Sequence, residues 1–106
     1  MANTYVNAKL DLTANSVTTL YTAVGITTGI VKSILVSEDS GNADTITVTV
    51  TNGSSVFSLF KTKAIGANAT VELLTAPLVL QPTEILKVTA ATANRLHVVA
   101  SILEIT

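Results

Sequence analysis

Asp44-Thr-Ile-Thr-Val-Thr-Val-Thr51 is the stretch that decides the fold. Apolar residues alternate strictly with threonine, so Ile46, Val48 and Val50 point to one face and the threonines to the other. This alternation predicts a half-buried β-strand, and β-branched threonines suit its solvent face. No window of eleven residues has apolar residues at helical spacing, so the pattern predicts an all-β protein.

Turn residues divide the rest of the chain into further short strands. The Asn52-Gly53 pair predicts a tight hairpin into Ser55–Lys63. Pro77 and Pro82 cannot donate to a β-ladder, so Leu78–Leu80 should lie at a sheet edge or in a crossover. Asparagine follows alanine before three of the strands, at Asn15, Asn68 and Asn94, which is favourable turn chemistry. The remaining strands are expected at Thr4–Leu12, Val17–Val24, Gly29–Ser37, Ala69–Thr75, Ile85–Ala90 and Arg95–Ile105.

About eight short antiparallel strands with regular turns predict a β-sandwich, and a jelly roll fits this number best. The chain has no Cys and no Trp, which argues against an immunoglobulin-type core. Its composition shows no break, and we expect a single β-sandwich domain over residues 1–106.

The composition is unusually apolar for such a small protein. Apolar residues make up 48% and charged residues 12% of the 106 residues, and the mean hydropathy is +0.57. No apolar run approaches the ~20 residues of a spanning helix, so no membrane partner is expected. The net charge is −1 and no basic stripe is present, so no nucleic-acid partner is expected. The surplus apolar surface should therefore be buried between subunits.

The last strand carries the clearest sign of assembly. Leu96, Val98, Ala100 and Ile102 form one face, and Val99, Leu103 and Ile105 lie on the other face with His97 and Ser101. One face of each strand in a sandwich meets solvent, where a large apolar side chain forgoes about 1.5–3 kcal/mol of burial energy. We therefore predict that Val99, Leu103, Ile105 and His97 form a subunit interface; a cover supplied by a loop of the same chain is the alternative.

Residues suited to catalysis or metal binding are scarce. His97 is the only histidine, and its apolar neighbours favour a structural or interface role over a catalytic one. Glu38, Asp39 and Asp44 cluster around a Gly-Asn turn, but their spacing does not match a calcium loop, and a solvated turn is expected. We predict no enzyme activity, no catalytic residues, no cofactor and no metal site.

Aromatic residues are few and include no Trp. Phe57 and Phe60 cannot share one face of a regular strand, so one should fill the core and the other should pack at an edge or interface. Sugar-binding surfaces usually display exposed aromatic side chains, which keeps a lectin-like role as a weak alternative.

The C-terminal third resembles small virion proteins of tailed bacteriophages, which end in a similar proline-led strand, a hairpin and a Ser-x-Leu-Glu-Ile close. The opening Tyr5-Val-Asn-Ala-Lys-Leu10 is of the same type. The segments that carry the resemblance are Ala76-Pro-Leu-Val-Leu80, Glu84-Ile-Leu-Lys-Val-Thr-Ala90, Ala93-Asn94 and Val98-Val-Ala-Ser-Ile-Leu-Glu-Ile105.

This resemblance implies a jelly-roll-like structural protein on the outer capsid surface of the virion. Capsid decoration or cement proteins of this kind are often trimeric, so the expected partners are other copies of the chain, in a homotrimer, and the major capsid protein. Related modules also occur in head fibres, tails and baseplates, where a role in binding host-surface glycans is the alternative.

Overall fold

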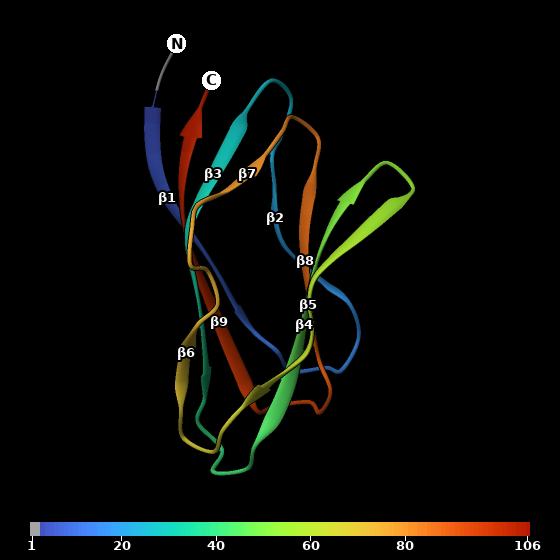
Figure 1. The fold of residues 1–106 in the computed structure, drawn as a ribbon, viewed down its shortest axis with the longest axis vertical. Helices are drawn as coiled ribbons and strands as arrows, with labels where there is room; N and C mark the ends of the chain where they lie inside the picture. The colour runs from blue at the N-terminus through green and yellow to red at the C-terminus, as the bar shows by residue number, and fades with distance from the viewer. Residues whose placement is uncertain (1–2) are drawn as a thin grey trace.

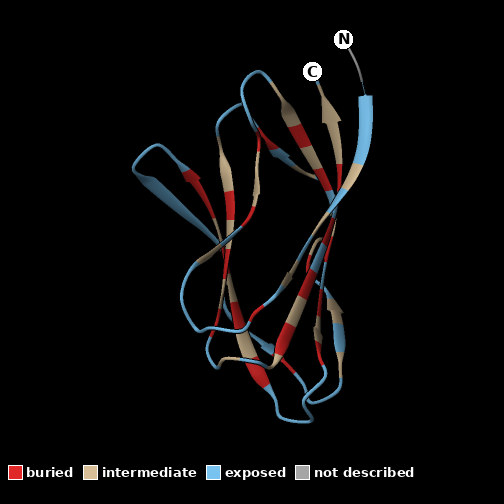
Figure 2. Ribbon diagram, turned by 180° about the vertical axis from the view of Figure 1, so that it is seen from behind, coloured by how far each residue is buried: buried red, intermediate tan, exposed pale blue. Residues whose placement is uncertain are grey.

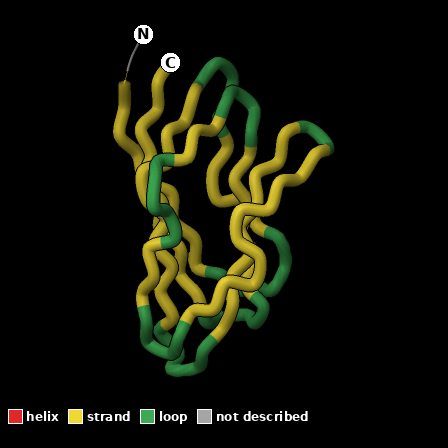
Figure 3. The backbone as a smooth tube through the Cα atoms, in the orientation of Figure 1, coloured by secondary structure: helices red, strands yellow, loops and turns green. Residues whose placement is uncertain are grey.

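A computed structural model describes residues 3–106, and within them every regular element is a β-strand (Figure 1, Figure 3). The strands are β1 (Asn3–Asp11), β2 (Thr18–Thr22), β3 (Thr28–Glu38), β4 (Asp44–Asn52), β5 (Ser55–Ile65), β6 (Thr70–Glu72), β7 (Leu78–Leu80), β8 (Ile85–Ala90) and β9 (Leu96–Ile105). They form two antiparallel sheets. Sheet A has the order β1-β9-β3-β6, with β7 also paired to β3, and sheet B has the order β2-β8-β4-β5.

The strand order is that of a jelly roll. Because β6 and β7 both pair with β3, they act as one strand interrupted around Pro77. The chain then folds back on itself in four antiparallel pairs: β1 with β9, β2 with β8, β3 with β6 and β7, and β4 with β5. Alternate pairs fall in opposite sheets, as two Greek keys require. The expected antiparallel, jelly-roll-like sandwich is confirmed, with nine strands in the described residues where about eight were expected.

The core lies between the two sheets and follows the alternation of the sequence (Figure 2). Every second residue of β4 and β8 is buried, and the same holds for the inner face of β9. Ile46 and Val48 of sheet B and Ile34 and Ile102 of sheet A are almost completely buried. The strand that decided the fold thus supplies the centre of sheet B, with its threonines on the outer face.

The tight hairpin after β4 is present, one residue later than the Asn52-Gly53 pair suggests. Asn52 pairs with Ser55, so the two loop residues are Gly53 and Ser54. Gly53 has a φ of 60° and Ser54 has a negative φ, which fits a turn with glycine at its first central position. Of the three Ala-Asn pairs, Asn68 and Asn94 have positive φ.

Phe57 and Phe60 share one face of β5, contrary to the expectation for a regular strand. Two register shifts interrupt the β4–β5 ladder, and as a result Phe57 lies opposite Val50 while Phe60 lies opposite Val48. Phe60 packs against the core, whereas Phe57 is 56% exposed. Phe60 thus agrees with the expectation that one of the two packs in the core, and the packing of Phe57 at an edge or interface stays a prediction.

Tyr21 connects the two sheets near the chain ends. It projects from β2 of sheet B onto Gly29 of β3, and its hydroxyl donates a hydrogen bond of 2.6 Å to Glu104 Oε2 of β9. Burial, together with this hydrogen bond and the negative charge of Glu104, raises the pKa of Tyr21 above its ordinary value. Glycine is required at position 29 because the tyrosine ring occupies the space of a side chain.

Gly29→Ala is expected to destabilise the fold by about 1–3 kcal/mol, because a Cβ would lie 2.8 Å from Tyr21 Cε2. Urea unfolding followed by far-UV circular dichroism measures this loss. Gly66→Ala is the matched control, since its Cβ would meet Ala69 at an ordinary 3.7 Å. Equal stability of the two variants would contradict the packing role of Tyr21.

Candidate functional site

An apolar row crosses the outer face of sheet A. Tyr5 pairs with Leu103, Leu103 pairs with Ile30, and Ile30 pairs with Val79, so four neighbouring strands contribute one side chain each. Residues opposite each other in antiparallel strands point to the same side of a sheet. Tyr5 is 76% and Val79 is 53% exposed, while Leu103 and Ile30 in the middle are half-buried. We call these four residues the apolar row.

The four residues expected at an interface all lie on this outer face. Leu103 is in the apolar row, and Ile105 is half-buried in the neighbouring row. Val99 is 37% exposed and pairs with Leu35, a second apolar contact on the same surface. His97 lies at the far end of β9. Since Val99 remains exposed and Leu103 and Ile105 are not fully buried, the described chain leaves this face partly open; their role in an interface stays a prediction.

A second exposed apolar surface lies on the β4–β5 hairpin, which projects from the sandwich (Figures 1 and 2). β5 is the last strand of sheet B and is exposed along nearly its whole length. Val56 is 62% exposed, and Phe57 and Leu59 are also exposed. Long, apolar edge strands are sites where another chain can pair or pack. We call Asn52–Leu59 the hairpin arm.

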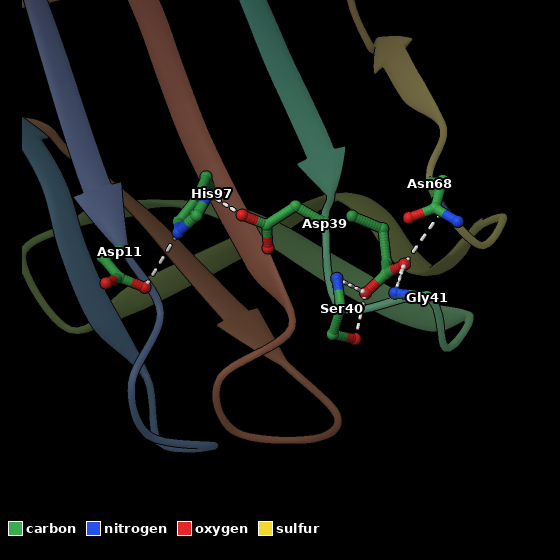
Figure 4. A network of polar contacts seen from close by, with 7 residues as sticks. Asp11, Asp39, Ser40, Gly41, Asn68 and His97 are labelled. Carbon is green, nitrogen blue, oxygen red and sulfur yellow. Dashed lines mark hydrogen bonds and ion pairs between the residues drawn. The ribbon is translucent and has the colours of Figure 1, made fainter.

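His97 lies between two carboxylates at the other end of sheet A (Figure 4). Its Nε2 is 3.2 Å from Asp11 Oδ1, and its Nδ1 is 3.3 Å from Asp39 Oδ2. Both aspartate side chains are largely exposed. The arrangement joins β1, β9 and the loop after β3. These contacts tie the three segments together, and a part for His97 in an interface stays a prediction.

Residues 39–43 of the turn are exposed, as the sequence suggests, but two of the three carboxylates around it are buried. Glu38 is only 2% exposed and Asp44 is buried as well. The Glu38 carboxylate accepts hydrogen bonds from the backbone N–H groups of Ser40, Gly41 and Asn68 and from the Ser40 hydroxyl (Figure 4). Glu38 departs from the expectation because the loop containing Asn68, far along the chain, closes over its carboxylate.

Glu38 ties the two loops together as a carboxylate. Burial alone would raise its pKa, but the hydrogen bonds from Ser40, Asn68 and Gly41 outweigh this effect and lower the pKa from 4.5 to about 2. The unfolded chain therefore takes up a proton near pH 4.5 while the folded chain does not. The stabilisation by Glu38 is fully present above that pH and is lost as the pH falls toward about 2.

Glu38→Gln should lower the melting temperature at neutral pH, because an amide presents one acceptor oxygen where the carboxylate presents two. Its stability should also fall less steeply than that of the wild type between about pH 4.5 and 2. Thermal melts followed by circular dichroism across this range measure both effects. Parallel curves for the two proteins would show that Glu38 does not carry this pH dependence.

A pocket of about 330 Å³ lies beside the apolar row. Tyr5 and Asn7 of β1 and Ser101 of β9 line it. Lys32 reaches it because a β-bulge between Val31 and Ser33 adds one residue to β3. Bulges often redirect a side chain in this way. The pocket combines an exposed aromatic ring with an ammonium, an amide and a hydroxyl group.

Metal sites and membrane-spanning helices are two further features to compare with the sequence. In residues 3–106, no group of three or more His, Cys, Asp or Glu side chains is placed to hold a metal ion. The same residues include no helix of a length and apolarity that would cross a membrane.

The chain matches no protein-family model, and no curated protein sequence is similar to it. Two crystal structures of a pentameric capsid protein isolated from metagenomic phage sequences, one of them solved by iodide phasing, are similar in fold. Their TM-scores are 0.48 and 0.46, both at 17% sequence identity over 93% of this chain. This chain spans 59% and 60% of their lengths. A likeness of this size establishes neither a common family nor a common function.

Proposed function

We propose that this chain is a non-enzymatic structural protein of a phage particle, which assembles with copies of itself and decorates the capsid. The observation that carries the proposal is the apolar row on the outer face of sheet A. A single sandwich leaves this face in water, and covering each large apolar side chain contributes about 1.5–3 kcal/mol. A few such side chains approach the stability of a whole small domain, so association is favourable.

The molecule is large enough for such contacts. It measures 44 × 27 × 22 Å, and the sheets run along its long axis. A face of this length can supply the roughly 800 Å² per partner of a standard protein interface. The mechanical role would be to bridge neighbouring capsid subunits and add contact area to a pressurised shell.

The resemblance of residues 76–105 to phage virion proteins supports the finer parts of the proposal. These are a homotrimer, a location on the outer capsid surface and the major capsid protein as partner. A single domain over residues 1–106 is proposed on a different ground, the composition without a break. The function is tested with a phage that encodes the chain, by deleting its gene and heating the particles. Particles without the protein should lose infectivity at lower temperature and should recover on addition of purified protein. Unchanged heat resistance would contradict a decoration role.

The Tyr5 pocket favours a second candidate function, recognition of an acidic sugar on the host surface. A sugar ring stacks on an exposed aromatic side chain, Lys32 would pair with its carboxylate, and Asn7 and Ser101 can hydrogen-bond its hydroxyl groups. Pockets of about 300–1,000 Å³ are typical of small-molecule sites, and this one lies at the lower end.

Titration with a uronic acid and with its neutral parent sugar, followed by NMR chemical shifts, distinguishes this candidate. Specific binding should favour the acid, should weaken in Lys32→Gln and should disappear in Tyr5→Ala. Binding that survives Tyr5→Ala, or no shift at the pocket residues with either sugar, would remove the candidate.

A further inference from the structure

The two exposed apolar surfaces belong to different sheets. The apolar row lies on the outer face of sheet A, and the hairpin arm belongs to sheet B. In Figure 1 the hairpin projects to one side of the sandwich while β1 and β9 lie on the other. One chain therefore cannot cover its own apolar row with its own hairpin arm. A symmetric contact between two sheet A faces would cover the rows but leave Val56 and Phe57 of both copies in water.

The charges beyond the apolar parts are complementary. The only charged residues of β5 are Lys61 and Lys63, both exposed. The exposed charged residues at the end of sheet A away from the apolar row are Lys9, Asp11, Asp39 and Glu72, three carboxylates to one ammonium group. Two of the carboxylates, Asp11 and Asp39, also contact His97.

We propose that the hairpin arm of one copy docks on the outer face of sheet A of the next copy, head to tail. Phe57 covers the apolar row, and Lys61 and Lys63, on the part of β5 that follows the arm, face Asp11 and Asp39. A contact between two different surfaces leaves one of each free on every added copy, so the assembly closes into a ring when the rotation permits. This inference rests on the proposed self-assembly and specifies its geometry.

Mixing two variants tests the geometry. Phe57→Asp damages only the arm, and Leu103→Asp damages only the sheet face. Each should sediment as an 11.0 kDa monomer on its own. In the mixture, the intact arm of the Leu103→Asp copy should bind the intact face of the Phe57→Asp copy. The product should be a heterodimer of two 11.0 kDa chains that cannot grow further.

The outcomes separate the inference from the proposed function. If the wild type is a monomer, self-assembly itself fails. If the wild type assembles and Phe57→Asp assembles equally well, or if the mixture remains monomeric, the head-to-tail contact is overturned. Formation of the heterodimer shows that both variants are folded, and thermal melts verify this for each alone. Val17→Asp, an exposed apolar site outside both surfaces, should assemble like the wild type.

Discussion

Leu103→Asp is expected to convert the assembled protein into monomers. Leu103 lies in the middle of the apolar row, between Tyr5 and Ile30. An aspartate there would be desolvated in the interface without a cationic partner opposite, which is costly. A loss of about 2.7 kcal/mol or more corresponds to at least a 100-fold weaker association.

Sedimentation velocity compares Leu103→Asp with the wild type and with Val17→Asp as the control. The Leu103 side chain is half-buried on the outer face and not part of the core, so the variant should keep its far-UV spectrum and most of its stability. An unchanged sedimentation coefficient for Leu103→Asp would remove Leu103 from the interface and with it the prediction for Val99 and Ile105 on the same face.

Ile102→Ala is expected to reduce the free energy of unfolding by about 2–5 kcal/mol, whereas Leu103→Asp acts on self-association. Ile102 precedes Leu103 on β9 but points to the core, where it is 1% exposed and lies opposite Val31. The cost comes from the lost burial of the side chain and from the cavity that remains. Small domains have about 5–15 kcal/mol of stability in total, so this single change removes a large share.

Urea unfolding at one protein concentration, with the same slope assumed for both proteins, measures the Ile102→Ala effect. Ile102→Val is the matched control and should cost about 0.5–1.5 kcal/mol. A loss for Ile102→Ala no larger than that for Ile102→Val would show that the inner face of β9 is less tightly packed than the structure indicates.

The alternation of apolar and polar residues was sufficient to predict the strands. Ile85–Ala90 and Leu78–Leu80 have the predicted bounds, and the strand containing Ile46, Val48 and Val50 ends one residue later than expected. Alternation failed where β-bulges interrupt the ladder, because an inserted residue reverses the side to which later residues point. Phe57 and Phe60 share a face for this reason.

The candidate site could be predicted only in part. The alternation within β9 placed Val99, Leu103 and Ile105 on one face, and this arrangement is what the structure has. Tyr5, Ile30 and Val79 were not predicted as their neighbours, because the pairing of strands distant in sequence leaves no local signal. Ile30 faces outward although it lies in an apolar run, and only its pairing with Leu103 shows this.

The buried carboxylate of Glu38 was also beyond the reach of local sequence patterns. Its four donors include Asn68, thirty positions away, and a surface turn with three acidic residues ordinarily remains in solvent. The Gly41 and Asn68 positive φ angles are consistent with turn residues that the sequence does show. What they enclose depends on the tertiary contact between two loops.

Sedimentation equilibrium of the purified wild-type chain at micromolar concentration is the most direct measurement of whether the chain self-associates. The outer face of sheet A and the hairpin arm together predict a discrete mass that is a multiple of 11.0 kDa, with three chains expected. A stable 11.0 kDa species at every concentration tested would mean that Tyr5, Leu103 and Phe57 remain exposed to solvent in a stable monomer. The account of this protein as a self-assembling structural subunit would then be wrong.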